Sequence, residues 1–518
     1  LFYNTSPPDP GRVTVRRLNR VEYNNTIRDL MRVDFEPAKD FPADDSGYGF
    51  DNIGDVLTMS PLLMEKYFTA AEKIAEKVVV IPDADGRIAT TPFQKFYFRY
   101  PLPPKLRRNA AEGFVRTFLT RAYRRPVQAE EVRRMMLLAK QVVDDGGSFE
   151  HGIRMAVAAT LVSPYFLFRW ELDGAPKNPK AIRSLNEHEL ASRLSYFIWN
   201  SMPDDALLEL AQRGQLRKNL SAQIRRMLRD AKAQSLVTSF AGQWLQLRDL
   251  ETIQPDKRLF GTFNNVIRDD MRRETEMLFA HVMRNNRSVV DFLDADYTFV
   301  NERLANWYGL KSLRGDEFQR VSLVGMPRGG VLTHASILTI TSDPNRTSPV
   351  KRGKYVLENI LGTPPPPAPD NVPDLGSSSE LKGTLRQQMV KHRENPVCAS
   401  CHQKMDPIGF AFENFDAIGR WRTLDNGAPI NAASQLDSGE KFGDVSGFLK
   451  ILAVRKRELF VQCLTEKMLT FAIGRGLEFY DKRAVDGIIK QMERDGFKFE
   501  TLVIGVAKSL PFDMKRGE

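Results

Sequence analysis

With 518 residues, the chain is long enough for about three domains. Its hydrophobic fraction of 42% and charged fraction of 27% are typical of a soluble globular protein, and its three cysteines exclude a disulfide framework. No run of about 20 apolar residues occurs, so no transmembrane segment is expected. The net charge of +10 favours acidic partners, such as an acidic redox protein, an anionic polysaccharide or a membrane surface. Nucleic acid is not an expected partner, because basic and acidic residues are interleaved and no nucleic-acid-binding motif accompanies them.

The first 90 residues predict helices on either side of a turn-rich segment. Asn19 followed by Glu22 predicts a capping box at the start of the first helix. Ser60 followed by Pro61 predicts the start of the second. Residues 34–58 between them lack a helical period, so we expect a structured loop there.

This loop contains three carboxylates, Asp44, Asp45 and Asp51, which could bind calcium. We favour the simpler interpretation, in which the loop binds no ion and is packed by Tyr48 and Phe50.

Most of the chain between residues 91 and 310 has helical periodicity. The aromatic-rich stretch 91–100 is the exception and predicts a short strand or coil. After a linker at 172–184, Asn186 followed by Glu189 predicts another capped helix start. Helices are also expected over 108–122, from there to about 143 as a second helix, and over 150–170. Two or three helices are expected over 201–250, and one each over 265–285 and 300–308.

From about residue 320 the pattern changes to polar, turn-forming segments that flank short apolar ones. A helix is expected over 351–361, and the four prolines that follow predict an extended polyproline stretch. Further helices are expected over 452–474 and 482–495. The predicted fold is therefore mainly α, a multi-helical scaffold with little β structure.

Cys398, Cys401 and His402 form the most informative motif. Two cysteines three positions apart, with a histidine directly after the second, are the attachment signature of c-type haem. Positions i, i+3 and i+4 of a helix share a face, so both thiols can reach the vinyl groups of one porphyrin while the imidazole reaches its iron. We expect one covalently bound haem c with His402 as the proximal axial ligand.

Two other chemistries fit the cysteine pair less well. A zinc site needs a second pair of ligands, and only Cys463 and scattered histidines remain. A thioredoxin-like dithiol would follow a strand of a βαβ unit, whereas a proline-rich linker and a charged segment precede this pair.

The sixth ligand of the iron separates an electron carrier from an enzyme with an open site. No histidine follows His402, so a distal histidine must come from upstream, with His334 as the first candidate and His392 as the second. We expect the protein to supply this ligand. The histidines expected on the surface or in the core are His151, His188 and His281. Methionines could act instead, namely Met468 or Met492, whereas Met405 is too near His402 to reach the opposite face of the haem.

Several side chains near the motif could line the haem pocket. Arginine forks suit carboxylates, so some of these side chains could pair with haem propionates or, equally, form salt bridges with nearby aspartates. Two aromatic residues, Tyr355 and Trp421, could pack on the porphyrin or fill the core. The basic candidates are Arg346, Lys351, Arg352, Arg420 and Arg422.

Six segments complete the pattern: RLNRVEYN at 17–24, RAYRRP at 121–126, ASRLSYFIW at 191–199, TSPVKRG at 347–353, DPIGF at 406–410 and ENFD at 413–416. With them, the chain resembles the large haem c proteins of planctomycete type, which are assembled from a fixed series of domains of unknown function. The resemblance covers nearly the whole chain and implies export and a redox role, but no substrate. Many relatives carry a further cytochrome-like segment before the first motif, so a relay between two haems is not expected within these residues.

The sequence thus predicts an exported, periplasmic haem c protein that transfers electrons. Haem attachment occurs outside the cytoplasm, so we expect a signal sequence upstream of Leu1. The alternatives are a haem oxidoreductase acting on peroxide or a carbohydrate, and a structural or assembly protein stapled by haem; whether the chain is an enzyme stays open. The helices from 12 to 310 are expected to form one scaffold, against which the haem region docks beneath the C-terminal helices. The expected domains are 1–90, 91–172, 183–310, 320–430 with the haem, and 431–518.

Overall fold

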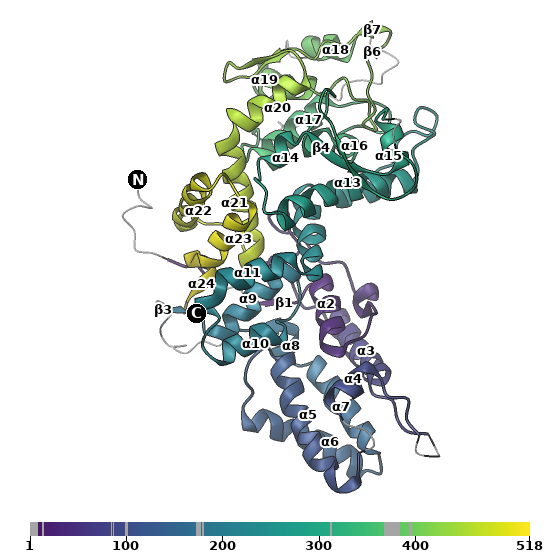
Figure 1. Ribbon diagram of the computed structural model, residues 1–518, viewed down its shortest axis with the longest axis vertical. Helices are drawn as coiled ribbons and strands as arrows, with labels where there is room; N and C mark the ends of the chain where they lie inside the picture. Colours follow the sequence, from purple (N-terminus) through teal and green to yellow (C-terminus); the bar gives the residue numbers. More distant parts are fainter. Residues whose placement is uncertain are drawn as a thin grey trace. The chain divides into compact units, whose positions relative to one another are not determined.

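The computed structural model describes residues 9–517 except 13–14, 84, 86, 99–101, 172–177, 179–180, 311–312, 367–383 and 393–395. Of residues 104, 390–392 and 396–400 it describes the backbone alone. Helices dominate, and the strands form short antiparallel pairs (Figure 1), which confirms the mainly α prediction. The chain divides into two compact units, one of residues 1–236, 469–484 and 504–518, and one of residues 237–468 and 485–503.

The first unit is built on helices whose starts are determined locally. Both predicted capping boxes are present, at Asn19 with Glu22 and at Asn186 with Glu189, and Ser60 caps its helix as expected. Its elements are β1 (Arg16–Arg17), α2 (Arg20–Met31), α3 (Pro61–Val78), α4 (Pro92–Tyr97), α5 (Arg107–Ala122), α6 (Ala129–Asp144), α7 (Phe149–Leu161), α8 (Pro164–Leu167), β2 (Phe168–Arg169), β3 (Ile182–Ser184), α9 (Glu187–Trp199), α10 (Asp205–Gln212), α11 (Leu220–Arg229), α24 (Leu510–Asp513) and β10 (Met514–Arg516).

The second unit contains the cysteine motif. Two π-helical segments occur here, Leu236–Ala241, whose first residue is assigned to the first unit, and Val356–Ile360. Its elements are α12 (Gly242–Trp244), α13 (Asn265–Arg284), α14 (Asp291–Asp294), β4 (Tyr297–Val300), α15 (Glu302–Trp307), β5 (Gln319–Ser322), α16 (Ala335–Ile340), α17 (Pro349–Tyr355), α18 (Leu385–His392), α19 (Pro396–Phe410), β6 (Leu424–Asp425), β7 (Ala428–Pro429), β8 (Ser434–Gln435), β9 (Lys441–Phe442) and α20 (Val445–Val454).

Three C-terminal helices contribute residues to both units: α21 (Arg457–Ile473), α22 (Lys482–Arg494) and α23 (Phe499–Lys508). The prediction of one scaffold over residues 12–310 is therefore wrong. Residues 237–310 belong to the unit that holds the cysteine motif, because they pack against the segment that precedes it. The Trp244 indole N–H donates to the carbonyl of Asn359 at 2.8 Å, and the Tyr355 hydroxyl donates to the carbonyl of Leu245 at 3.0 Å.

Two local predictions also need correction. The stretch 91–100 contains a helix, α4, because Thr91 and Gln94 form a capping box with Pro92 at the first helical position. The helix expected over 150–170 ends at Leu161, where Ser163 and Pro164 start the separate helix α8.

The loop before α3 is held by its polar side chains as well as by packing. Phe50 is fully buried as expected, but Tyr48 is 61% exposed. The Asp44 carboxylate accepts hydrogen bonds from the Arg17 side chain and the Arg20 backbone, both at 2.7 Å. Asp51 accepts from the Asn19 amide at 3.0 Å. In the part of the chain that the structure describes, no three His, Cys, Asp or Glu side chains gather in a way that could hold a metal ion.

Among the described helices, none is both long enough and apolar enough to cross a lipid bilayer.

Candidate functional site

Helix α19 carries the whole cysteine motif. The backbone is helical from Pro396 through His402, so Cys398, Cys401 and His402 have the i, i+3, i+4 spacing that places them on one face. The side chain of Cys398 lies outside the described part. The Cys401 thiol is partly exposed, whereas His402 is only 9% exposed.

His402 is held by a carboxylate one helical turn further on. Its Nδ1 lies 2.9 Å from the Oδ1 of Asp406, and the Asp406 side chain is fully buried. With Nδ1 donating to this carboxylate, the lone pair of the ring is on Nε2. A carboxylate that orients an imidazole in this way is the arrangement found behind metal-ligating histidines. The residues described here therefore fit an axial haem ligand.

The partner of His402 was not recognised from the sequence. The sequence indicated nearby aspartates, Asp406 among them, only as salt-bridge partners of the arginines. The signal was present, because an aspartate four residues after a histidine on a helix lies beside it.

Helix α17 crosses α19 at two glycines. A Cβ on Gly353 would overlap the carbonyl oxygen of Met405, and a Cβ on Gly409 would overlap the carbonyl of Pro349. Only glycine allows two helix backbones to approach this closely. Both glycines come from the sequence motifs 347–353 and 406–410, so these motifs determine how α19 is held.

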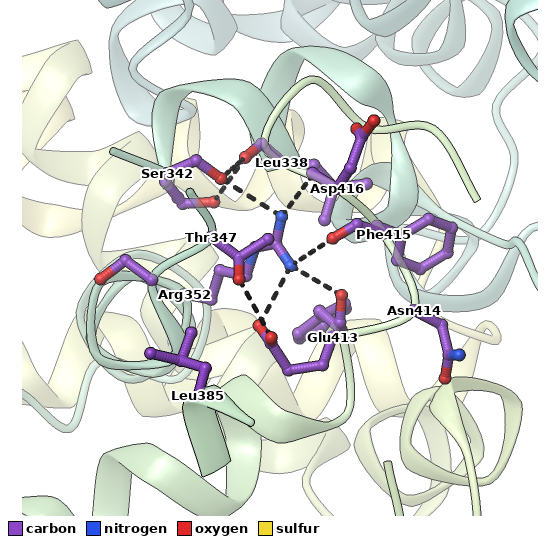
Figure 2. A network of polar contacts seen from close by, with 12 residues as sticks. Leu338, Ser342, Thr347, Arg352, Leu385, Glu413, Asn414, Phe415 and Asp416 are labelled. Atoms are coloured by element: carbon purple, nitrogen blue, oxygen red, sulfur yellow. Dashed lines mark hydrogen bonds and ion pairs between the residues drawn. The ribbon is translucent and has the colours of Figure 1, made fainter. Parts of the chain in front are cut away.

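The buried Arg352 fastens the turn that follows α19 (Figure 2). Its guanidinium donates to the carbonyls of Phe412 at 2.6 Å, Phe415 at 2.9 Å and Asp416 at 2.8 Å. It also donates to the Ser342 hydroxyl at 3.2 Å. Burial lowers the pKa of Arg352 to about 10, and the nearby Glu413 carboxylate at 3.6 Å opposes this shift.

Glu413 itself joins three segments of the unit. Its Oε2 accepts hydrogen bonds from the Thr347 hydroxyl and from the Arg422 guanidinium, each at 3.0 Å. Burial raises the pKa of Glu413 despite both arginines. The motifs 347–353 and 413–416 thus form one structural network, in which three hydrogen bonds of Arg352 go to backbone carbonyls.

The other proposed pocket residues also have protein partners. Arg346 and Lys351 both pair with Asp343, at 3.2 and 2.7 Å. The Arg420 guanidinium lies 3.7 Å from the centre of the Trp307 ring and donates to the Thr262 hydroxyl.

The two aromatic candidates differ. Trp421 packs edge-on against Phe415 and remains 41% exposed, whereas Tyr355 is buried in the core. The assignment of Arg346, Arg352, Arg420 and Trp421 to a haem pocket remains a prediction.

His334 lies inside a different buried network. Its Nδ1 is 2.9 Å from the Thr275 hydroxyl, and its Nε2 faces the Thr298 hydroxyl at 3.4 Å and Glu274 at 3.8 Å. Burial lowers the pKa of His334 to about 3, so the ring is neutral. To serve as the distal ligand, this imidazole would have to leave its network.

The other candidates for the sixth position are placed as follows. His392 is the last residue of α18, and its side chain lies outside the described part. Met405, Met468 and Met492 are all buried, and the Met492 sulfur lies 4.0 Å from the Thr465 hydroxyl.

The three remaining histidines have protein environments of the expected kind. His281 packs against the rings of Tyr297 and Phe299, and His151 contacts Ser148 in a helix cap. Burial lowers the pKa of His188.

Comparison with family models divides the chain into five consecutive matches. Each model is described as a protein of unknown function: DUF1587 matches residues 16–80, DUF1595 matches 110–171, DUF1592 matches 185–310, DUF1588, named PSCyt3, matches 328–425, and DUF1585 matches 438–512. The cysteine motif lies within the PSCyt3 match. No curated protein and no solved structure matches the chain.

Proposed function

The chain has the five-domain architecture of the planctomycete-type multi-domain proteins associated with cytochrome c, and on this premise we propose that it is an exported electron-transfer protein with one haem c attached to Cys398 and Cys401. The observation that carries the proposal is the hydrogen bond between His402 Nδ1 and Asp406 within the helix of the cysteine pair. With Nδ1 directed at the carboxylate, Nε2 is the ring nitrogen that would ligate the iron.

Each residue of the motif has a specific role in holding the haem. Cys398 and Cys401 would hold the haem through two thioether bonds. His402 supplies the proximal nitrogen, and the buried Asp406 fixes its tautomer and ring orientation. When bound, haem supplies an iron that changes oxidation state by one electron. The basic net charge of the chain favours an acidic redox partner.

The first test is covalent attachment. The full chain should be produced in a periplasm with the c-type maturation machinery, then stained for haem after denaturing electrophoresis and quantified as a pyridine haemochrome. We expect one haem per chain, and none in the Cys398→Ser/Cys401→Ser variant. The matched control is Cys463→Ser, because this third thiol is buried and its pKa is raised to about 11; it should retain the full stain. An unstained wild-type protein, or stain that persists in the double variant, contradicts the proposal.

The second test separates electron transfer from chemistry at an open site. Reduced-minus-oxidised spectra are recorded with and without carbon monoxide or cyanide. An electron carrier with a protein sixth ligand keeps its spectrum during the first minutes after the ligand is added. Rapid binding of carbon monoxide would instead favour the haem oxidoreductase.

A further inference from the structure

A cavity in the first unit is lined almost entirely by cations. Among the described residues on its wall, Glu171 supplies the single carboxylate. The basic side chains that line the cavity are Arg12, Arg16, Arg169, Arg193, Arg475 and Lys515.

Four of these six cations already have carboxylate partners inside the unit. The pairs are Arg12 with Asp55, Arg16 with Glu22 at 2.8 Å, Arg193 with Glu171 at 2.7 Å, and Arg475 with Asp481 at 2.7 Å. Arg169 and Lys515 form no direct ion pair within the described part of the chain, although the Glu171 carboxylate attracts both. The Arg169 guanidinium lies 5.0 Å from the centre of the Tyr196 ring. Lys515 donates to the backbone carbonyl of Glu171 at 3.0 Å, and the buried Nε of Arg169 has no hydrogen-bond acceptor. The six cations on the wall of the cavity therefore outnumber by two the four carboxylates that pair with them directly.

The strand pairing brings two of these arginines together. In the two-stranded sheet of β1 and β2, Arg16 lies directly opposite Arg169. Like charges at directly opposite positions destabilise a strand pair. Burial, followed by the nearby Arg16, lowers the pKa of Arg169 to about 9. An anion between the two guanidiniums would remove this repulsion.

The backbone is shaped to admit the side chains that line the cavity. Gly11 and Gly474 both have positive φ angles, of +86° and +69°. A Cβ on Gly11 would overlap the Arg475 guanidinium, and one on Gly474 would lie 2.9 Å from the Arg16 Nε. Arg16, Arg475 and Lys515 are themselves nearly fully buried. The cluster is therefore part of the packed interior, unlike a solvated basic face.

We propose that this cavity binds a small oxoanion of the phosphate or sulfate class, held by Arg169 and Lys515 with the paired arginines around it. Guanidinium forks match the oxygens of such anions and form charge-assisted hydrogen bonds with them. The free space that the centres of water molecules can occupy is about 30 Å³, which suits an ion of a few heavy atoms and excludes a nucleotide.

The test measures binding of inorganic phosphate to the full chain in a chloride buffer, by calorimetric titration and by thermal unfolding at constant ionic strength. We expect saturable binding of one phosphate per chain and a higher unfolding temperature in phosphate or sulfate than in chloride. Arg169→Gln should weaken phosphate binding about tenfold or more, because it removes charge-assisted hydrogen bonds. The matched control is Arg133→Gln on α6, whose arginine side chain is 63% exposed, with an expected change of less than about twofold.

A stability readout distinguishes loss of binding from misfolding. In chloride, Arg169→Gln should unfold at the same temperature as the wild type or higher, because it removes the repulsion with Arg16. If this variant does not fold, Lys515→Gln serves in its place. The proposal is overturned if chloride stabilises the chain as much as phosphate does at equal ionic strength. It is also overturned if the exposed control weakens phosphate binding as much as the cavity variant.

Discussion

The fold disfavours the ionised form of Glu274. It is fully buried, and its oxygens accept hydrogen bonds from the hydroxyls of Tyr308 at 2.5 Å and Thr298 at 2.7 Å. Desolvation nevertheless raises its pKa to about 7. Because the neutral form is the one the interior tolerates, the carboxyl takes up a proton on folding between its ordinary pKa and pH 7.

This shift predicts a pH-dependent stability. The folded pKa of Glu274 is above the unfolded value, so its contribution is most favourable below about pH 4.5 and is lost as the pH rises to about 7. In Glu274→Gln the amide mimics the protonated carboxyl, and the free energy of unfolding should exceed that of the wild type at pH 8 by on the order of 3 kcal/mol. The measurement is urea unfolding at pH 5 and pH 8. A difference between the two proteins that is the same at both pH values would contradict this assignment.

His402 and Asp406 are a second case in which one residue decides the chemistry of another. The imidazole is four residues before the carboxylate, and the helix brings them to 2.9 Å. Since Nδ1 is engaged, Nε2 is the nitrogen from which a metal can be bound. This pairing is the reason for expecting a stable ligand geometry in α19.

At the scale of elements, the crossing of α17 and α19 determines where the motif is held. Gly353 and Gly409 let the two backbones touch, and Arg352 ties the end of α17 to the turn after α19. The segment 347–353 thus acts through packing and hydrogen bonding to the backbone.

Gly353→Ala should therefore be strongly destabilising. A methyl group at this position overlaps the Met405 carbonyl, and the backbone of α19 has to shift, at a cost of about 3 kcal/mol or more in the free energy of unfolding. The control is Gly487→Ala in α22 of the same unit, where nothing lies within 4 Å of the added Cβ. There alanine should be neutral or stabilising by up to about 1 kcal/mol, since it is the better helix former. Chemical denaturation of both variants measures the difference, and equal effects would mean that the helices are not in contact at Gly353.

On the scale of the whole molecule, the chain folds as two units, and the cysteine motif lies in only one of them. A thioether-linked haem stays on the chain after unfolding, so it would stabilise the unit that holds it through contacts made only in the folded state, such as that of His402 with the iron. Stability within a protein can also differ between cooperative segments.

If haem c is attached as proposed, hydrogen exchange should show which unit it stabilises. In the haem-loaded protein, amides in residues 237–366 and 396–468 should exchange more slowly than in Cys398→Ser/Cys401→Ser, while amides in residues 9–236 exchange equally in both. Mass spectrometry of peptides after exchange measures this directly. Equal slowing in both regions would show that the two units unfold together. The Cys463→Ser variant should match the wild type throughout.

The sequence by itself determined those features that depend on neighbouring residues. Helix starts at Asn19, Ser60 and Asn186 follow from a side chain that bonds the backbone two or three positions on. The i, i+3, i+4 spacing of Cys398, Cys401 and His402 needs only one helical turn, and α19 provides it. The haem site itself stays a prediction.

The tertiary structure decided everything that depends on distant segments meeting. Local patterns could not indicate that Arg352 would be directed at carbonyls after α19, that Arg16 would face Arg169 across a strand pair, or that residues 237–310 would belong with the cysteine motif. The reason is physical: an arginine can donate hydrogen bonds to many different acceptors, and a glycine fits at many different positions along the chain. Only the packing of the folded protein selects which carbonyl, which carboxylate or which helix lies against it.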